Sequence, residues 1–280
     1  MSENKVLAVM GSPGSGKTTA AIKLALELAK HRKNAVVVFC DPFAAVIPYI
    51  LPADTAVDTS LGALLTAPGV TQADILDACV PIPQSGYISL LGYKAGESLM
   101  TYPKITKDKT VDFFVMLRHL ADYVLIDCSA VFEADPVSIV GIETADAALR
   151  LGTSNLKGIS YFQSHMPMLA DSVFRSHEHL KAISLLKPGQ EWEAVSQQYG
   201  GADFMLPYAP ELEKQFDEVT LLEPLTAKES QPYAAEIQKI AGGVFGIKGA
   251  PVKAPAEESP KKTKGKPAFK LPFGKSKGEF

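Results

Sequence analysis

The sequence predicts a three-layer α/β/α fold built on a mostly parallel, twisted sheet. Two observations predict this architecture. Short apolar runs rich in β-branched residues alternate with amphipathic helical segments between residues 6 and 241, which is the pattern of repeated strand–helix–strand units. In addition, a glycine-rich turn joins the first apolar run directly to the first helical segment. Because such sheets bind ligands where their strands end, we expect the functional site at the carboxyl edge.

The composition is that of an ordinary globular protein: 46% of the 280 residues are hydrophobic, 21% are charged, and the formal net charge is −3. This charge gives no general signature of polyanion binding. The three cysteines, Cys40, Cys79 and Cys128, lack metal-ligand spacing and are typical of buried thiols in a reducing compartment. The apolar run over 5–10 is too short for a signal peptide, and no apolar run of about 18 residues is present. We therefore expect a cytoplasmic protein.

The first predicted strand, residues 6–10, runs into a phosphate-binding P-loop. The loop reads Gly11-Ser12-Pro13-Gly14-Ser15-Gly16-Lys17-Thr18, which fits the pattern G-x-x-x-x-G-K-[ST]. Its backbone N–H groups, and the N-terminus of a helix predicted from Thr19 to residue 30, should surround phosphate oxygens. We expect Lys17 to contact the β- and γ-phosphates and the Thr18 hydroxyl to bind Mg²⁺. The pattern predicts a nucleotide-binding protein.

Two aspartates end predicted buried strands near this loop. The β-branched run over 35–40 leads into Asp41 and Pro42, so Asp41 is expected beside Mg²⁺ and the attacking water; alternatively, it simply begins a turn. The run over 123–127 ends in Asp127 and has the Walker B pattern, in which a strand presents a carboxylate to Mg²⁺ through water.

The remaining elements continue the alternation. We predict short helices over 60–66 and 73–80, a strand over 86–93 and an amphipathic helix over 108–120. Further along, we predict a strand over 145–152, a helical region over 155–170 broken at Pro167, a strand over 181–187, a helix over 191–198, a strand over 202–206, a helix ending at Phe216 and a last helix over 230–241.

The composition changes near the C-terminus, and this change divides the chain into a P-loop ATPase domain over 1–247 and a lysine- and proline-rich tail over 248–280. The tail has too little apolar area to offset the entropy of ordering, so we expect it to be disordered. Two roles stay open for the tail. It either keeps the protein soluble or attaches it electrostatically to anionic membrane lipid at the inner face, to nucleic acid, or to an acidic partner.

Taken together, the P-loop, the pair Asp41-Pro42, the strand over 123–127 and the stretch over 204–225, which begins Phe-Met-Leu-Pro-Tyr-Ala-Pro-Glu, resemble the ParA/MinD family of ATPases. The pilus-assembly localisation proteins of the Tad/Cpa secretion systems belong to this family. The resemblance covers roughly residues 4–245.

This resemblance implies a switch that binds ATP or ADP with Mg²⁺, forms a nucleotide-dependent homodimer and positions plasmids, division proteins, pili or secretion machinery through protein partners. Lys17 and Thr18 match the family's phosphate and Mg²⁺ residues, and Asp41 and Asp127 match its switch I and switch II aspartates. Pro207 and the residues after it resemble the segment that packs against the nucleotide base.

One position departs from the family pattern. The family usually has a second lysine after the first glycine of the loop, whereas this chain has Ser12 followed by Pro13. A weak ATPase and a non-hydrolysing, nucleotide-bound scaffold therefore both stay open. A nucleotide kinase is a third possibility, since the loop also fits Gly-x-Pro-Gly-x-Gly-Lys. The chain has only four arginines for a phosphoryl clamp: Arg32, Arg118, Arg150 and Arg175. Outside the tail the protein is acidic, which disfavours DNA binding and favours a secretion or pilus role.

Overall fold

The computed structural model describes residues 4–247 except 53, 54, 56 and 99, and it confirms the predicted α/β architecture. The described strands form one eight-stranded sheet in the order β3-β4-β2-β5-β1-β6-β7-β8. Neighbouring strands are parallel except β3, which pairs antiparallel with β4. The strands are β1 (Val6–Gly11), β2 (Ala35–Phe39), β3 (Val80–Pro81), β4 (Ile88–Gly92), β5 (Tyr123–Asp127), β6 (Ala147–Thr153), β7 (Leu180–Leu186) and β8 (Phe204–Pro207).

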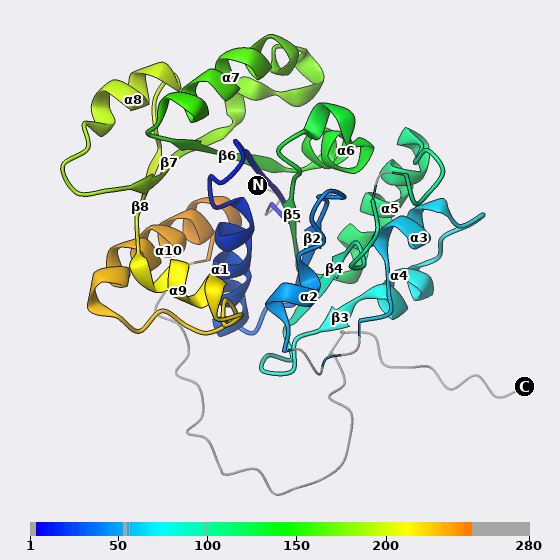
Figure 1. Ribbon diagram of the computed structural model, residues 1–280. Coiled ribbons are helices and arrows are strands. Elements are labelled where there is room, and N and C mark those ends of the chain that lie inside the picture. The colour runs from blue at the N-terminus through cyan, green and yellow to red at the C-terminus, as the bar shows by residue number, and fades with distance from the viewer. Residues whose placement is uncertain (1–3, 53–54, 56, 99, 248–280) are drawn as a thin grey trace, which may run out of the picture.

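Helices cover both faces of this sheet (Figure 1). They are α1 (Lys17–Lys30), α2 (Ile47–Ile50), α3 (Leu61–Thr66), α4 (Gln72–Ala78), α5 (Lys107–Leu120), α6 (Pro136–Thr144), α7 (Leu156–Leu169), α8 (Trp192–Gln198), α9 (Pro210–Asp217) and α10 (Gln231–Phe245). Four short 3₁₀ segments are η1 (Phe132–Ala134), η2 (Ser172–Phe174), η3 (Ser176–Glu178) and η4 (Lys228–Ser230). Among the described residues, no helix is both long enough and apolar enough to cross a membrane.

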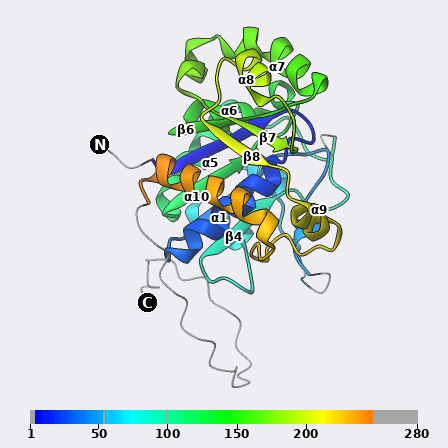
Figure 2. The ribbon, with the colours of Figure 1, turned by 90° about the vertical axis from the view of Figure 1, so that its left-hand side faces the viewer.

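Two apolar layers fix these helices to the sheet, because side chains alternate between its faces. On β1, Leu7 and Val9 belong to one core with α1, α2 and α10, whereas Ala8 and Met10 belong to the other core with α3, α4, α5 and α6. Helices α1 and α10 lie side by side in two perpendicular views (Figures 1 and 2). The central strand β1 is therefore buried on both faces, and its carboxyl end can hold a rigid loop.

The structure corrects two local predictions. The helix expected over 73–80 ends at Ala78, because Cys79 is extended and Val80 begins the edge strand β3. Helix α7 is not broken at Pro167, because this proline lies in the last turn, where its missing N–H removes one helical hydrogen bond without ending the helix. The tail predicted over 248–280 lies outside the described residues.

Helix α6 was not predicted, although its N-terminus carries a clear signal. Asp135 is the N-cap and accepts hydrogen bonds from the N–H groups of Val137 and Ser138, at 3.1 and 3.0 Å, and Pro136 occupies the first turn. Asp135 is itself buried, and burial raises the pKa of its carboxyl to about 6.

We expect Asp135→Ala to lower the free energy of unfolding by about 1–2 kcal/mol, because the cap of α6 loses its acceptor. Asp135→Asn keeps an acceptor oxygen and removes the buried charge, so it should cost less. Chemical denaturation of the two variants beside the wild type measures both effects. Equal stability of Asp135→Ala and the wild type would show that the cap contributes nothing.

Candidate nucleotide-binding site

The P-loop follows β1 in a conformation that requires its glycines. Gly14 and Gly16 have φ angles of 71° and 81°, in the left-handed region that favours glycine. A Cβ atom on Gly11 would lie 2.4 Å from the carbonyl oxygen of Leu151, so the loop approaches β6 more closely than any side chain permits. The loop therefore sits directly on the carboxyl end of the sheet.

The N-terminus of α1 is left open to an anion. Its N-cap, Gly16, provides no side-chain acceptor, and the first turn contains no acidic residue. The hydroxyl oxygens of Ser12 and Ser15 are buried without a partner in the described part of the chain. Free N–H groups at a helix N-terminus and unpaired hydroxyls suit phosphate oxygens. The residues present thus fit the phosphate group predicted from the sequence.

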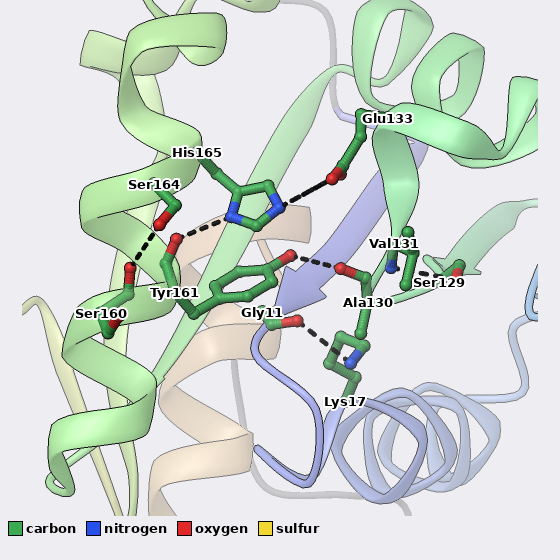
Figure 3. A network of polar contacts seen from close by, with 10 residues as sticks. All are labelled: Gly11, Lys17, Ser129, Ala130, Val131, Glu133, Ser160, Tyr161, Ser164 and His165. Carbon is green, nitrogen blue, oxygen red and sulfur yellow. Dashed lines mark hydrogen bonds and ion pairs between the residues drawn. The ribbon is translucent and has the colours of Figure 1, made fainter.

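Lys17 lies inside this loop. Its Nζ donates to the carbonyl oxygen of Gly11 at 3.2 Å (Figure 3). It also donates to the carbonyl oxygen of Ser12 at 3.3 Å. Burial lowers the pKa of Lys17, while the charges of Asp127 and Asp41 act in the opposite direction. Because both bonds are long and their acceptors carry no charge, phosphate oxygens at the same place would stabilise the ammonium group better than these carbonyls do.

Asp127 ends β5 beside β1, with Val9 as its register partner, and its carboxylate reaches α1. The Thr18 hydroxyl donates to Asp127 Oδ2 at 2.6 Å, whereas the buried Oδ1 has no partner among the described residues. Burial is the main cause that raises the pKa of Asp127 to about 6, against the bond from Thr18 and the charge of Lys17. A buried carboxylate with one free oxygen, paired with a threonine hydroxyl, is a donor set suited to Mg²⁺.

Asp41 lines the same cleft as Asp127 and the P-loop. Its Oδ1 also accepts a hydrogen bond from the Phe43 N–H at 2.9 Å, so it begins a turn as well. The two roles considered for Asp41 are compatible, because the second carboxylate oxygen has no hydrogen bond within the described ranges and stays available to the cleft.

The cleft has a volume of about 770 Å³ and extends from the P-loop to α9. Several of its lining residues were not predicted: Thr153 at the end of β6, Ser154 and Asn155 after this strand, Ser184 and Lys187 on and after β7, and Leu212 and Phe216 on α9. Pro207 ends β8, and its neighbours Leu206, Tyr208 and Ala209 line the cleft. The packing of Pro207 against a base stays a prediction. The positions of β6, β7 and β8 in the sheet identify these residues, because the strands end at the same edge.

Helix α7 holds the loop that follows Asp127. Tyr161 Oη donates to the carbonyl oxygen of Ala130 at 2.8 Å, and His165 Nε2 lies 3.1 Å from a carboxylate oxygen of Glu133 (Figure 3). The rings of Tyr161 and His165 stack, with centroids 4.0 Å apart. This loop begins immediately after Asp127, and its position is therefore linked to that of α7.

We expect the free energy of unfolding of the ligand-free protein to decrease as pH rises, because of Asp127. The folded protein keeps this proton up to about pH 6, while the unfolded chain loses it near 3.8, so the contribution is present at acid pH and is lost as pH rises through about 6. Asp127→Asn does not titrate. The free energy of unfolding of the wild type relative to this variant should fall by up to about 3 kcal/mol between about pH 4 and 7.

Denaturation curves recorded without Mg²⁺ or nucleotide provide this measurement, since Mg²⁺ would bind the carboxylate and the phosphates would change the charge around it. A difference between wild type and Asp127→Asn that does not change with pH would contradict the burial of a titrating carboxyl at this position.

No family model and no curated protein matches the sequence. Solved structures do match the fold. The ParA family ATPase of Chlorobium tepidum is 14% identical with a TM-score of 0.68, covering 85% of this chain and 98% of its own. The MinC:MinD cell division protein complex of Aquifex aeolicus matches at 17% identity and a TM-score of 0.64, covering 89% and 99% of the two chains. The septum site-determining protein MinD of Pyrococcus horikoshii, complexed with Mg-ADP, is 17% identical with a TM-score of 0.62, and the match covers 84% of this chain and 95% of that protein. The chain therefore has the fold of the MinD and ParA ATPases, as its motifs indicate.

Proposed function

We propose that this protein is a cytoplasmic ATP-binding switch of the ParA/MinD type, which hydrolyses ATP slowly, dimerises with nucleotide and positions a cellular assembly. The observation that carries the proposal is the hydrogen bond between Thr18 and Asp127. This bond of 2.6 Å joins α1 to β5, and the other carboxylate oxygen of Asp127 is buried without a partner among the described residues. The fold shared with a Mg-ADP-bound MinD supports the same assignment.

The residues of the cleft have different proposed roles, according to where they lie. The N–H groups of the loop and Lys17 bind the phosphates, and Thr18 and Asp127 would hold Mg²⁺, which neutralises charge on the phosphates when bound. Asp41, which lines the same cleft, would orient a water molecule. The apolar and aromatic residues near α9, Tyr208, Leu212 and Phe216, give the base a surface to pack on.

Ser12 supports a slow reaction. Ser12 is 2% exposed and its hydroxyl is buried, so this position contributes nothing to a partner's nucleotide. A cation that would otherwise stabilise the transition state is missing at this position. The same observation favours a second candidate function, a scaffold that binds ATP or ADP tightly and does not hydrolyse it.

A kinase is disfavoured by the lining of the cleft. Phosphoryl-transferring clamps are built from arginines, and none of the described residues that line this cleft is an arginine.

The charge of the folded part suggests which kind of cellular assembly this switch positions. The tail is rich in lysine, so residues 1–247 are more acidic than the net charge of −3 of the whole chain, which disfavours DNA binding by the folded part. A role in placing secretion or pilus machinery through a protein partner suits this charge better than plasmid partition. The tail would strengthen attachment to an anionic membrane surface.

ATP turnover and molecular mass, measured on the same samples with ATP–Mg²⁺, with ADP and without nucleotide, test the proposal. We expect slow turnover and a dimer favoured by ATP, both lost in Lys17→Ala because the phosphates lose their cation. Tight binding without turnover, whatever the mass, would establish the scaffold instead.

Asp41 separates binding from hydrolysis. Asp41→Asn keeps the acceptor for the Phe43 N–H and removes the charge, so nucleotide affinity should stay within a fewfold of wild type while turnover is lost. Asp41→Ala should lose turnover in the same way. Binding of a fluorescent ATP analogue and phosphate release measure the two properties. Unchanged turnover in Asp41→Asn would show that this carboxylate does not act on water.

A further inference from the structure

A second cavity lies on the α7 and α8 side of strands β6 and β7. Its volume is about 210 Å³. Most of its walls are apolar or glycine backbone: Phe162 and Met166 from α7, Ala182 and Ile183 from β7, Tyr199 after α8, and Gly152, Gly200 and Gly201. The remaining lining residues have polar side chains: Arg150, Lys181, Gln163 and Gln198. None of these described lining residues is acidic. The cavity is therefore mainly apolar and carries positive charge.

Arg150 is the unusual member of this set. The residue is 7% exposed, and its guanidinium has one hydrogen-bond partner within the described ranges, the Met166 sulfur at 2.9 Å from Nη1. A thioether is a weak acceptor, and a guanidinium has five N–H donors. No carboxylate of the described residues lies within 4.0 Å of it. A charge this far buried, with only a thioether as its hydrogen-bond acceptor, is costly, so the cavity beside it suits an anionic ligand.

The neighbouring charged groups do not satisfy Arg150. Asp203 lies close enough to influence it, but the Asp203 carboxylate accepts from the backbone N–H of Lys181 at 2.8 Å. The Lys181 ammonium donates to the carbonyl oxygen of Gly200 and adds a second positive charge to the cavity. An anion in the cavity would meet two cations and no like charge on the walls.

We propose that this cavity binds a small organic carboxylate with an apolar body, held by Arg150. A guanidinium matches a carboxylate in a bidentate, planar arrangement. Phe162, Met166 and Ile183 supply apolar contact for the rest of the molecule. The single buried guanidinium and the apolar walls favour a monocarboxylate over inorganic phosphate, which has no apolar part and carries more charge.

The cavity is joined to the nucleotide cleft by hydrogen bonds. Tyr199 covers Gly152 so closely that a Cβ there would lie 2.5 Å from its ring, and its Oη donates to the carbonyl oxygen of Thr153 at 2.8 Å. Thr153 lines the nucleotide cleft. Ser184, on the adjacent strand, donates to the P-loop carbonyl oxygen of Ser15 at 2.8 Å. Carboxylate binding should therefore change nucleotide affinity, a consequence that rests on the proposed function.

Calorimetric titration of the full chain with benzoate, benzamide and inorganic phosphate tests the site without nucleotide. We expect saturable benzoate binding at one site, and at least tenfold weaker binding of benzamide and of phosphate. The comparison uses wild-type protein alone, so it does not depend on the folding of a variant. Equal affinity for benzoate and benzamide, or no saturable binding of benzoate, would overturn the proposal and leave water as the occupant.

A matched pair of variants tests whether the positive charge of Arg150 binds the carboxylate. Arg150→Met removes the guanidinium and keeps an apolar chain, and Lys157→Gln removes one positive charge from an exposed position on α7. Benzoate affinity should fall at least tenfold in Arg150→Met and stay within twofold in Lys157→Gln. The same affinity in Arg150→Met and wild type would overturn the role of Arg150.

The link to the cleft is measured by repeating the benzoate titration with ATP–Mg²⁺. Any change in benzoate affinity must appear as an equal change in ATP affinity when benzoate is present. Benzoate binding that is independent of nucleotide would overturn the link, while loss of ATP binding with intact benzoate binding would overturn the proposed function and leave the carboxylate site standing.

Discussion

The hydrogen bond between Thr18 and Asp127 is the interaction around which the site is arranged. It connects the first turn of α1 to the last residue of β5, two segments 109 positions apart in the chain. This contact is possible because β1 and β5 are adjacent and parallel, so that both strands end at the same edge of the sheet. The neighbouring contact of Gly11 with Leu151 fixes the other side of the loop against β6. A helix N-terminus, a lysine and a carboxylate are thereby held together without a ligand.

Charges buried in this way are costly to the folded state. Burial lowers the pKa of Lys17 and raises that of Asp127, which means that both charged forms are poorly solvated in their places. Arg150, on β6, is in a similar situation. The protein tolerates these groups because close-packed apolar layers on both faces of the sheet hold the strands, and ligands of opposite charge would relieve the cost at each place.

Much of the fold and part of the site could be predicted from the sequence. The P-loop glycines, Lys17, Thr18 and the aspartates that end β2 and β5 are local signals, readable because each strand is a continuous apolar run. The residues that α7 contributes, Tyr161 and His165, could not be found in this way, since their partners Ala130 and Glu133 lie about thirty residues away and their contact depends on packing. Asp135 followed by Pro136 is a local sign of a helix start, but the largely buried residues after it do not alternate between apolar and polar as in an amphipathic helix. Pro167 shows the reverse, a strong local signal outweighed by its place in the last helical turn.

The two ends of the sheet have a feature in common. Each described edge strand is short and contains a proline, Pro81 in the two residues of β3 and Pro207 in the four residues of β8. A proline offers no N–H to an incoming strand, and so short an edge gives little length for pairing. Growth of the sheet from one molecule into the next is therefore disfavoured at both edges. At high local concentration, copies of this protein are thus protected against indiscriminate pairing of their sheet edges.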